Sequence, residues 1–239
     1  MAKTKKLSKN FSNRDFAKKF DEIAGKFDLI SNRYTLARRC KEALEYVHGK
    51  CLEVGAGTGN VFSYLKNEGK KGKKDYILSD ISLSMCRAAV QKHNASAVCC
   101  DAERLPFAGE TFDAIISMEV IYYLQNPENF IKESRRLLRK NGKLVIIMAN
   151  QDMKIYDQTR GFLRKMGVGR MYFDDGITQF MKLAKLQGIL EKNGFRITSK
   201  KKIVIFPSRM LHGLNLLIEK TFLDYFCAFV LVAAEKKRL

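Results

Sequence analysis

Residues 51–59 read Cys51-Leu52-Glu53-Val54-Gly55-Ala56-Gly57-Thr58-Gly59, an apolar run that contains an acid and is followed by three glycines at alternate positions. The pattern predicts a strand, a tight turn and the start of a helix, because glycine lets a backbone pass close to a ligand without a Cβ clash. The free N–H groups at the start of that helix would then face polar or anionic atoms of the ligand.

The spacing of the glycines separates two kinds of nucleotide loop. A dinucleotide fingerprint has the form G-x-G-x-x-G, but the position of its third glycine is Asn60 in this chain. The form found here, E-x-G-x-G-x-G, resembles the cofactor loop of class I S-adenosylmethionine-dependent methyltransferases, which wraps the methionine half of the cofactor. For the loop taken alone, an ordinary glycine turn is the alternative.

Two acidic positions further along the chain extend this resemblance. A second predicted strand ends at Asp80, whose two carboxylate oxygens form a fork that matches the vicinal hydroxyls of a ribose. The resemblance implies that Ile81 contacts the adenine face. The later stretch Asp101-Ala102-Glu103-Arg104-Leu105-Pro106-Phe107 is similar to a recurrent D-A-x-x-L-P-F loop of the family. There the aspartate accepts from the adenine amine and the next backbone N–H meets a ring nitrogen.

The resemblance therefore implies S-adenosylmethionine as the cofactor. A fourth predicted strand, residues 112–118, ends at Met118, whose position touches the cofactor in the family. The residues expected to bind the cofactor are Glu53, Gly55, Ala56, Gly57, Asp80, Ile81, Asp101, Ala102 and Met118. No metal site is expected, because the six cysteines form no C-x-x-C pair and are interpreted as small buried thiols.

Strands that alternate with helices predict an α/β fold, a Rossmann-like, mostly parallel sheet with helices on both faces. The resemblance adds a seventh, antiparallel strand. We expect a disordered basic tail at 1–14 and one methyltransferase domain at 15–239. Within this domain, residues 15–48 form a helical N-terminal cap over the cleft, and 150–176 and 207–222 form lid segments. Further predicted elements are a helix from Pro127 to Gly142, strands at 143–149, 195–206 and 225–234, and a helix at 178–193.

The charge balance suggests contact with a polyanion. The 239 residues carry a net charge of +19, which favours a nucleic acid or an anionic membrane surface. The basic residues are scattered, so a solvated lysine-rich surface is the alternative. The first twenty residues hold no apolar core of a signal peptide. The longest apolar run, 225–234, is too short to cross a bilayer. These features predict a cytoplasmic protein.

Acceptor chemistry leaves few marks in the sequence. Methyl transfer from a sulfonium mainly requires alignment and exclusion of water, and a general base is optional. Tyr123 and His212 are the candidates for a base, and packing or capping is the alternative role for each. In relatives that methylate quinone hydroxyls the position of Tyr123 is usually His.

The predicted function is methyl transfer to a small-molecule acceptor with an apolar part. The alternatives are a lipid or isoprenoid-quinone methyltransferase, or a nucleic-acid-binding protein with or without methylation activity. Basic surface residues could support peripheral membrane contact or nonspecific contact with nucleic acid. The acceptor atom and the oligomeric state stay open.

Overall fold

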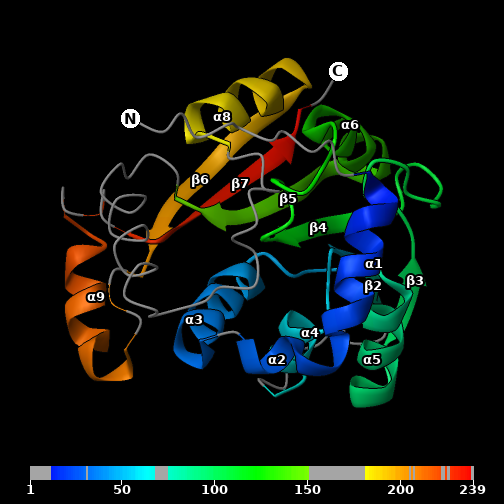
Figure 1. Cartoon of the computed structure of the whole chain (residues 1–239). Helices are drawn as coiled ribbons and strands as arrows, with labels where there is room; N and C mark the ends of the chain where they lie inside the picture. The colour runs from blue at the N-terminus through cyan, green and yellow to red at the C-terminus, as the bar shows by residue number, and fades with distance from the viewer. Residues whose placement is uncertain are drawn as a thin grey trace, which may run out of the picture.

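A computed structural model describes residues 12–30, 32–67, 75–150, 181–204, 206, 208–221, 224 and 227–237. This part of the chain forms a seven-stranded sheet with the order β3-β2-β1-β4-β5-β7-β6 (Figure 1). The strands are β1 (Cys51–Val54), β2 (Tyr76–Asp80), β3 (Ser96–Cys99), β4 (Phe112–Met118), β5 (Leu138–Ala149), β6 (Phe195–Ile203) and β7 (Phe229–Lys236). Only β7 runs antiparallel to its neighbours, so the predicted Rossmann-like sheet is confirmed.

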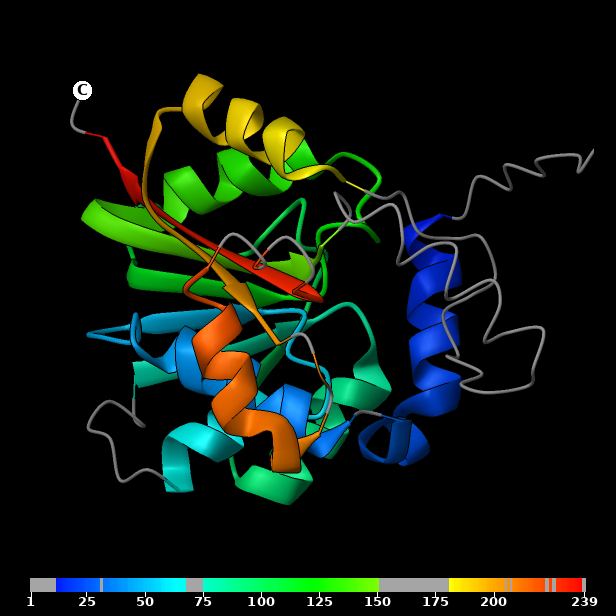
Figure 2. The same ribbon diagram turned by 90° about the vertical axis from the view of Figure 1, so that its left-hand side faces the viewer.

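Helices cover both faces of this sheet. The helical segments are α1 (Asn13–Ile23), η1 (Ala24–Lys26), α2 (Phe27–Ile30), α3 (Arg33–Leu44), α4 (Asn60–Asn67), α5 (Leu83–His93), α6 (Pro127–Leu137), α8 (Leu183–Lys192), η3 (Arg209–Leu211) and α9 (His212–Ile218). Helices α6 and α8 lie on one face, and α3, α4 and α5 lie on the other (Figure 2). Adjacent residues of β4 alternate between the two cores: Ile115 packs on the α6 face and Ile116 on the α3 face.

The edge formed by the carboxyl ends of the strands has a switch point. From β1 the chain continues to β2 and β3 on one side, whereas β4 pairs with the other side of β1. Open α/β sheets bind ligands at such a point. Helix α1 stands at this edge (Figure 2). Ser12 and Asp15 form a capping box at its start, so the helix begins two residues before the predicted domain boundary at 15.

Several predicted boundaries are wrong. Helix α6 ends at Leu137, not at Gly142, because Leu138 already has the extended backbone that starts β5. The turn at Asn141, where φ is 62°, therefore lies inside the strand. The predicted strand at 225–234 begins only at Phe229. The predicted helix at 207–222 is shortened to η3 and α9.

Other predictions concern the burial of a cysteine and two segments that the structure does not describe. Cys99 is exposed, contrary to prediction, because β3 is the edge strand of the sheet. Residues 1–11 of the predicted tail and residues 151–176 of the first predicted lid lie outside the described residues. Asn150, the residue just before that segment, is buried, and its amide donates to the carbonyl of Cys227 at 2.9 Å.

Candidate functional site

A cavity of about 590 Å³ opens at the carboxyl edge of the sheet, beside the switch point between β1 and β4. Its volume lies within the range of roughly 300–1,000 Å³ that is usual for ligand pockets. Residues at the ends of β1, β2, β4 and β5 line it, together with the start of β7 and the helices α1 and α3. All nine residues expected to bind the cofactor are among them.

The glycine loop after β1 forms one wall of the cavity. The φ angles of Gly55 and Gly57 are 71° and 55°, a left-handed conformation that side chains other than glycine rarely adopt. A Cβ at Gly55 would lie 2.1 Å from the Cγ2 atom of Val120. Backbone hydrogen bonds from Gly55 and Ala56 to the carbonyl of Ser79 hold the loop against β2. The loop therefore requires glycine both for conformation and for space.

Asp80, at the end of β2, is oriented by two backbone N–H groups. Its Oδ2 accepts from Gly57 at 2.8 Å and its Oδ1 accepts from Ser82 at 2.9 Å. Burial raises the pKa of this carboxyl, and the two N–H groups act in the opposite direction. A carboxylate can accept about four hydrogen bonds, so Asp80 retains capacity for a ligand.

Glu53 lies beneath the same wall and is only 2% exposed. The hydroxyl of Tyr76 donates to its Oε2 at 2.9 Å. Burial raises the pKa of Glu53 to about 8, partly offset by this hydrogen bond, and the nearby Asp80 raises it further. The carboxyl is therefore mostly protonated at neutral pH, and a cationic group bound beside it would lower its pKa.

Two aspartates of the N-terminal helices tie these helices to the loops after β1 and β2. The hydroxyl of Ser82 donates to Asp21 at 2.6 Å, and the hydroxyl of Thr58 donates to Asp28 at 2.5 Å. Both aspartates lie within residues 15–48, the predicted helical cap. Phe16, Phe20 and Phe27 from this cap line the cavity.

Asp101, from the loop after β3, also contacts the N-terminal segment. The side-chain amide of Asn13 donates to its Oδ2 at 2.5 Å, and the backbone N–H of Glu103 donates to its Oδ1 at 2.9 Å. The N-terminal helix therefore reaches the expected adenine end of the cavity as well as the glycine loop.

The side of the cavity nearest β5 and β7 contains an ionisable cluster that the sequence analysis missed. Glu119 follows β4 directly and has a φ of 63°, a strained value that often marks a functional site. Its Oε2 accepts from the hydroxyl of Tyr122 at 2.5 Å, and the Nη1 atom of Arg39 lies 3.7 Å away. Its other oxygen, Oε1, has almost no solvent-accessible area, and no described residue donates a hydrogen bond to it.

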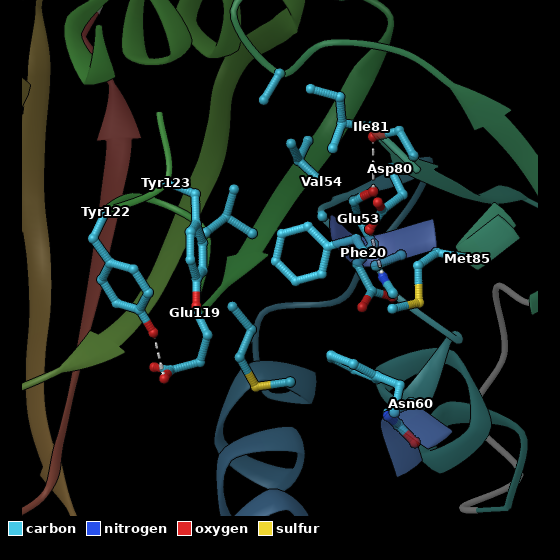
Figure 3. A pocket seen from close by; sticks show the side chains of 18 of the residues that line it. Phe20, Glu53, Val54, Asn60, Asp80, Ile81, Met85, Glu119, Tyr122 and Tyr123 are labelled. Atoms are coloured by element: carbon cyan, nitrogen blue, oxygen red, sulfur yellow. Dashed lines mark hydrogen bonds between the residues drawn. The ribbon is translucent and has the colours of Figure 1, made fainter. Parts of the chain in front are cut away.

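The pKa of Glu119 reflects competing effects. Burial raises it, whereas Arg39 and the Tyr122 hydroxyl lower it, with burial the largest of these influences. In the sequence, the only sign of Glu119 as a site residue is its place directly after a strand whose carboxyl end lies at the ligand-binding edge of the sheet. Figure 3 shows Glu119, Tyr122 and Tyr123 on one side of the pocket and Glu53, Asp80 and Ile81 on the other.

Apolar groups surround this cluster. Arg39, on α3, is 8% exposed, and its guanidinium carbon lies 4.2 Å from the ring centroid of Phe229. The apolar residues that line this part of the cavity are Phe16, Phe20, Leu36, Leu124, Ala149, Val204, Ala228 and Phe229. An acceptor in this space would meet a mainly apolar surface with one acidic group.

The two candidate bases have different positions. Tyr123 lines the cavity and packs edge-to-face with Phe16 and Phe20, with ring centroids 5.6 Å and 5.4 Å away. His212, at the start of α9, is not among the cavity residues. Its Nδ1 atom lies 3.1 Å from the hydroxyl oxygen of Tyr34. None of the described residues of 207–222 lines the cavity. Helix α9 contacts α3 through the Tyr34–His212 and Tyr34–Asn215 pairs, and a lid role of 207–222 stays a prediction.

Comparisons with known proteins agree with this geometry. Residues 52–146 match the model of a methyltransferase domain. The ubiquinone/menaquinone biosynthesis C-methyltransferase of Syntrophotalea carbinolica is 27% identical, and the match covers 74% of this chain and 84% of that protein. An uncharacterized protein of Methanocaldococcus jannaschii is 26% identical over 92% of this chain and 87% of its own length. The fold is also similar to a solved S-adenosylmethionine-dependent methyltransferase of Thermotoga maritima, with a TM-score of 0.70 and 20% identity. The superposition covers 92% of this chain and 99% of the Thermotoga chain.

The glycine loop, the acid after β2 and the seven-stranded sheet define a nucleoside-binding α/β enzyme. Together with the domain match, they show that the chain belongs to the class I S-adenosylmethionine-dependent methyltransferases. S-adenosylmethionine is its cofactor. The residues present fit this group, since Gly55 has no room for a Cβ beside the loop and Asp80 offers a forked acceptor.

Proposed function

We propose that this methyltransferase acts on a small acceptor that has an apolar body and one polar group, and that Glu119 receives this polar group. The observation that carries the proposal is the water-shielded Oε1 of Glu119, which lacks a hydrogen-bond donor among the described residues, within a largely apolar part of the cavity. A buried polar atom usually has a partner. An acceptor hydroxyl or amine would supply one when the Glu119 carboxyl, which lines the cavity, turns Oε1 toward it.

The cofactor is proposed to lie on the β1–β2–β3 side. Asp80 would accept from the ribose hydroxyls beside Ile81, and Asp101 and the backbone N–H of Ala102 would face the adenine. The turn at Gly55, Ala56 and Gly57 would approach the methionine half, with Glu53 beneath it and Met118 toward the acceptor. These placements rest on the shared cavity and on the family resemblance of the loops.

Bound in this way, the sulfonium supplies an electrophilic methyl group. The acceptor atom would take this methyl group from the cofactor's sulfur, and Glu119 would receive the acceptor's proton on Oε1. Arg39 favours the ionised carboxylate that can take this proton. Phe16, Phe20 and Tyr123 pack together over the site, which would exclude water from the transfer.

An isoprenoid-quinone acceptor is the second candidate. The quinone C-methyltransferase relative supports it, as does the apolar lining next to Phe229. The aromatic Tyr123 differs from the usual His of enzymes that methylate quinone hydroxyls, so this candidate would rely on Glu119 instead. The nucleic-acid alternative and nonspecific polyanion contact stay predictions.

The test separates cofactor binding from turnover in the variants Glu119→Gln and Tyr122→Phe. We expect Glu119→Gln to keep the S-adenosylmethionine affinity while turnover falls about 10²–10⁴-fold, the usual contribution of a general base. Affinity is measured by calorimetry. Turnover is measured with methyl-labelled cofactor on a cell extract separated into apolar and polar fractions.

The matched control is Glu235→Gln, since Glu235 is a β7 carboxylate that pairs with Arg196 away from the cavity. Unchanged turnover in Glu119→Gln, or labelled product in the polar fraction alone, would contradict the proposal. A quinone acceptor would appear as labelled product in the apolar fraction that pure quinone precursors reproduce.

A further inference from the structure

The segment formed by η3 and α9 carries an unusual concentration of exposed apolar side chains. The described residues include eight large apolar residues that are exposed, and five of them fall between positions 210 and 217. They are Met210, Leu211, Leu214, Leu216 and Leu217, and we call them the η3–α9 surface. Met210 is 95% exposed and Leu217 is 65% exposed. Concentrated exposure of this kind marks an interaction surface more often than scattered single residues do.

The helix is attached to the protein by its polar side chains. Asn215 is fully buried. Its Oδ1 accepts from the N–H of Phe206, and its Nδ2 donates to the carbonyl of Phe206 and to the hydroxyl of Tyr34. Glu219, one residue after α9, accepts from the N–H of Val204 at 2.8 Å and from Arg38 at 2.7 Å. A surface helix normally has the opposite arrangement, with its apolar stripe against the core.

This arrangement fixes the apolar side chains toward the outside. A helix of seven residues has little stability by itself, so its orientation depends on the contacts of Asn215 and Glu219. If the helix rotated to turn the side chain of Leu214 or Leu217 toward the core, those hydrogen bonds would break. A buried amide that loses its hydrogen-bond partners is costly. Figure 1 shows α9 at the outer edge of the molecule, beside α3.

Charge next to this surface indicates the kind of partner. Leu216 borders a groove that also contains Lys200, Lys201, Lys202 and Lys220. With Arg38, this groove has five basic side chains against three acidic ones, Glu42, Glu219 and Asp224. Arg38, Lys201 and Lys202 form ion pairs with these acids, so Lys200 and Lys220 carry the excess positive charge. Arg209 lies next to Met210 at the other end of the surface. Apolar residues with basic neighbours fit an anionic interface that has an apolar interior.

We propose that the η3–α9 surface docks the enzyme on the surface of an anionic phospholipid membrane. The apolar side chains would enter the boundary between headgroups and acyl chains, while Lys200, Lys220 and Arg209 meet the lipid phosphates. Nowhere in the described part of the chain is a helix long and apolar enough to cross a membrane, so the contact is peripheral. The net charge of +19 disfavours a second copy of this chain as the partner, because like charges would face each other.

The test is flotation of the full chain with vesicles of phosphatidylcholine alone or of phosphatidylcholine mixed with phosphatidylserine. The unmodified chain should bind the mixed vesicles, and binding should weaken as salt is added. The double variant Met210→Ser with Leu217→Ser should lower partitioning at least about tenfold, because each serine removes apolar area that would enter the interface. Both residues are exposed, and a melting curve checks that the fold is kept.

The matched control is Leu29→Ser, since Leu29 is 81% exposed and lies on α2. It should bind the mixed vesicles as the unmodified chain does. Equal binding by the double variant would show that charge alone is responsible and would overturn the proposal, as would the absence of binding to the mixed vesicles. A dimer in solution that the double variant abolishes would assign the surface to a second copy and also overturn it. None of these readouts depends on the acceptor.

Discussion

The two sides of the cavity are built in different ways. On the proposed cofactor side, the wall comes from short continuous stretches that follow β1, β2 and β3, and backbone N–H groups orient its main acid, Asp80. On the proposed acceptor side, Arg39 comes from α3, Glu119 from the end of β4 and Phe229 from the start of β7. These three side chains are brought together only by the tertiary structure, in which β5 lies beside β4, β7 lies beside β5, and α3 packs on this side of the sheet.

The difference shows what each side tolerates. A wall made by backbone conformation depends on glycine and on local turns, so its pattern is compact and recognisable. A pocket made by side chains from distant elements can change its chemistry without changing any local pattern. We therefore expect substitutions on the cofactor side to alter binding of S-adenosylmethionine, and substitutions on the acceptor side to alter turnover.

The largest effect is expected from Gly55→Ala. The new Cβ would lie 2.1 Å from the Cγ2 atom of Val120, at a φ of 71°, so the loop or the Val120 side chain that it packs against must shift. We expect the affinity for S-adenosylmethionine to fall about 100-fold, which corresponds to about 3 kcal/mol, as measured by calorimetry. The control is Gly188→Ala in α8, where nothing lies within 4 Å of an added Cβ. Unchanged affinity in Gly55→Ala would mean that this wall does not hold the cofactor.

An intermediate effect is expected on the acceptor side from Arg39→Gln. Arg39 lowers the pKa of Glu119, so its removal should raise that pKa further. Because Glu119 must be ionised to take a proton, the acidic limb of the turnover profile should move to higher pH. Turnover near neutral pH should fall about tenfold or more, while the affinity for S-adenosylmethionine stays the same.

Initial rates across a pH series measure this shift, and Arg196→Gln on β6 is the control, since Arg196 pairs with Glu235 outside the cavity. A profile that keeps its position in Arg39→Gln would separate Arg39 from the chemistry. Lost cofactor affinity in this variant would break the division of the cavity into two sides.

The last effect is on stability rather than on binding or turnover, and it concerns Glu53, a buried acid on the cofactor side of the cavity. Its folded-state pKa of about 8 lies above the ordinary value of 4.5. The stability that its neutral form contributes is therefore complete below about pH 4.5 and is lost as the pH rises through about 8. Relative to Glu53→Gln, the free energy of unfolding of the unliganded protein should fall with a slope of at most about 1.4 kcal/mol per pH unit.

Urea unfolding between pH 5 and 8 would measure this slope. Parallel curves for the two proteins would mean that Glu53 is already ionised in the unliganded fold. In that case the acid would be ready for a cationic ligand, and the cofactor side would need no proton release on binding.

Sequence reasoning was accurate where the structure is local and less so where it is not. The strand at 112–118 and the start of α6 at Pro127 appear at the predicted places, because a strand run and a helix start depend on adjacent residues. The end of α6 was predicted too far along the chain, because the Asn141–Gly142 turn was taken as the end of the helix although it lies inside β5. A turn motif cannot show whether it ends a helix or interrupts a strand.

The candidate site residues follow the same division. Every residue expected to bind the cofactor lines the cavity, whereas His212 does not and Glu119 was overlooked. His212 is a candidate because an imidazole can act as a base, but its ring contacts Tyr34 and lies outside the cavity. Glu119 has chemistry that many surface acids share, and only its burial beside Arg39 and Tyr122 distinguishes it.

The sequence by itself determined the class of enzyme, the cofactor loop and the order of strands and helices. These depend on glycine conformations, on hydrophobic periods and on acids at strand ends, which are properties of neighbouring residues. Only the tertiary structure decided that Arg39, Glu119 and Phe229 share one pocket, and that the apolar residues of α9 point away from the protein. Such relations depend on contacts between segments far apart in the chain, where burial sets the pKa of a group and the packing partner sets the direction of a helix face.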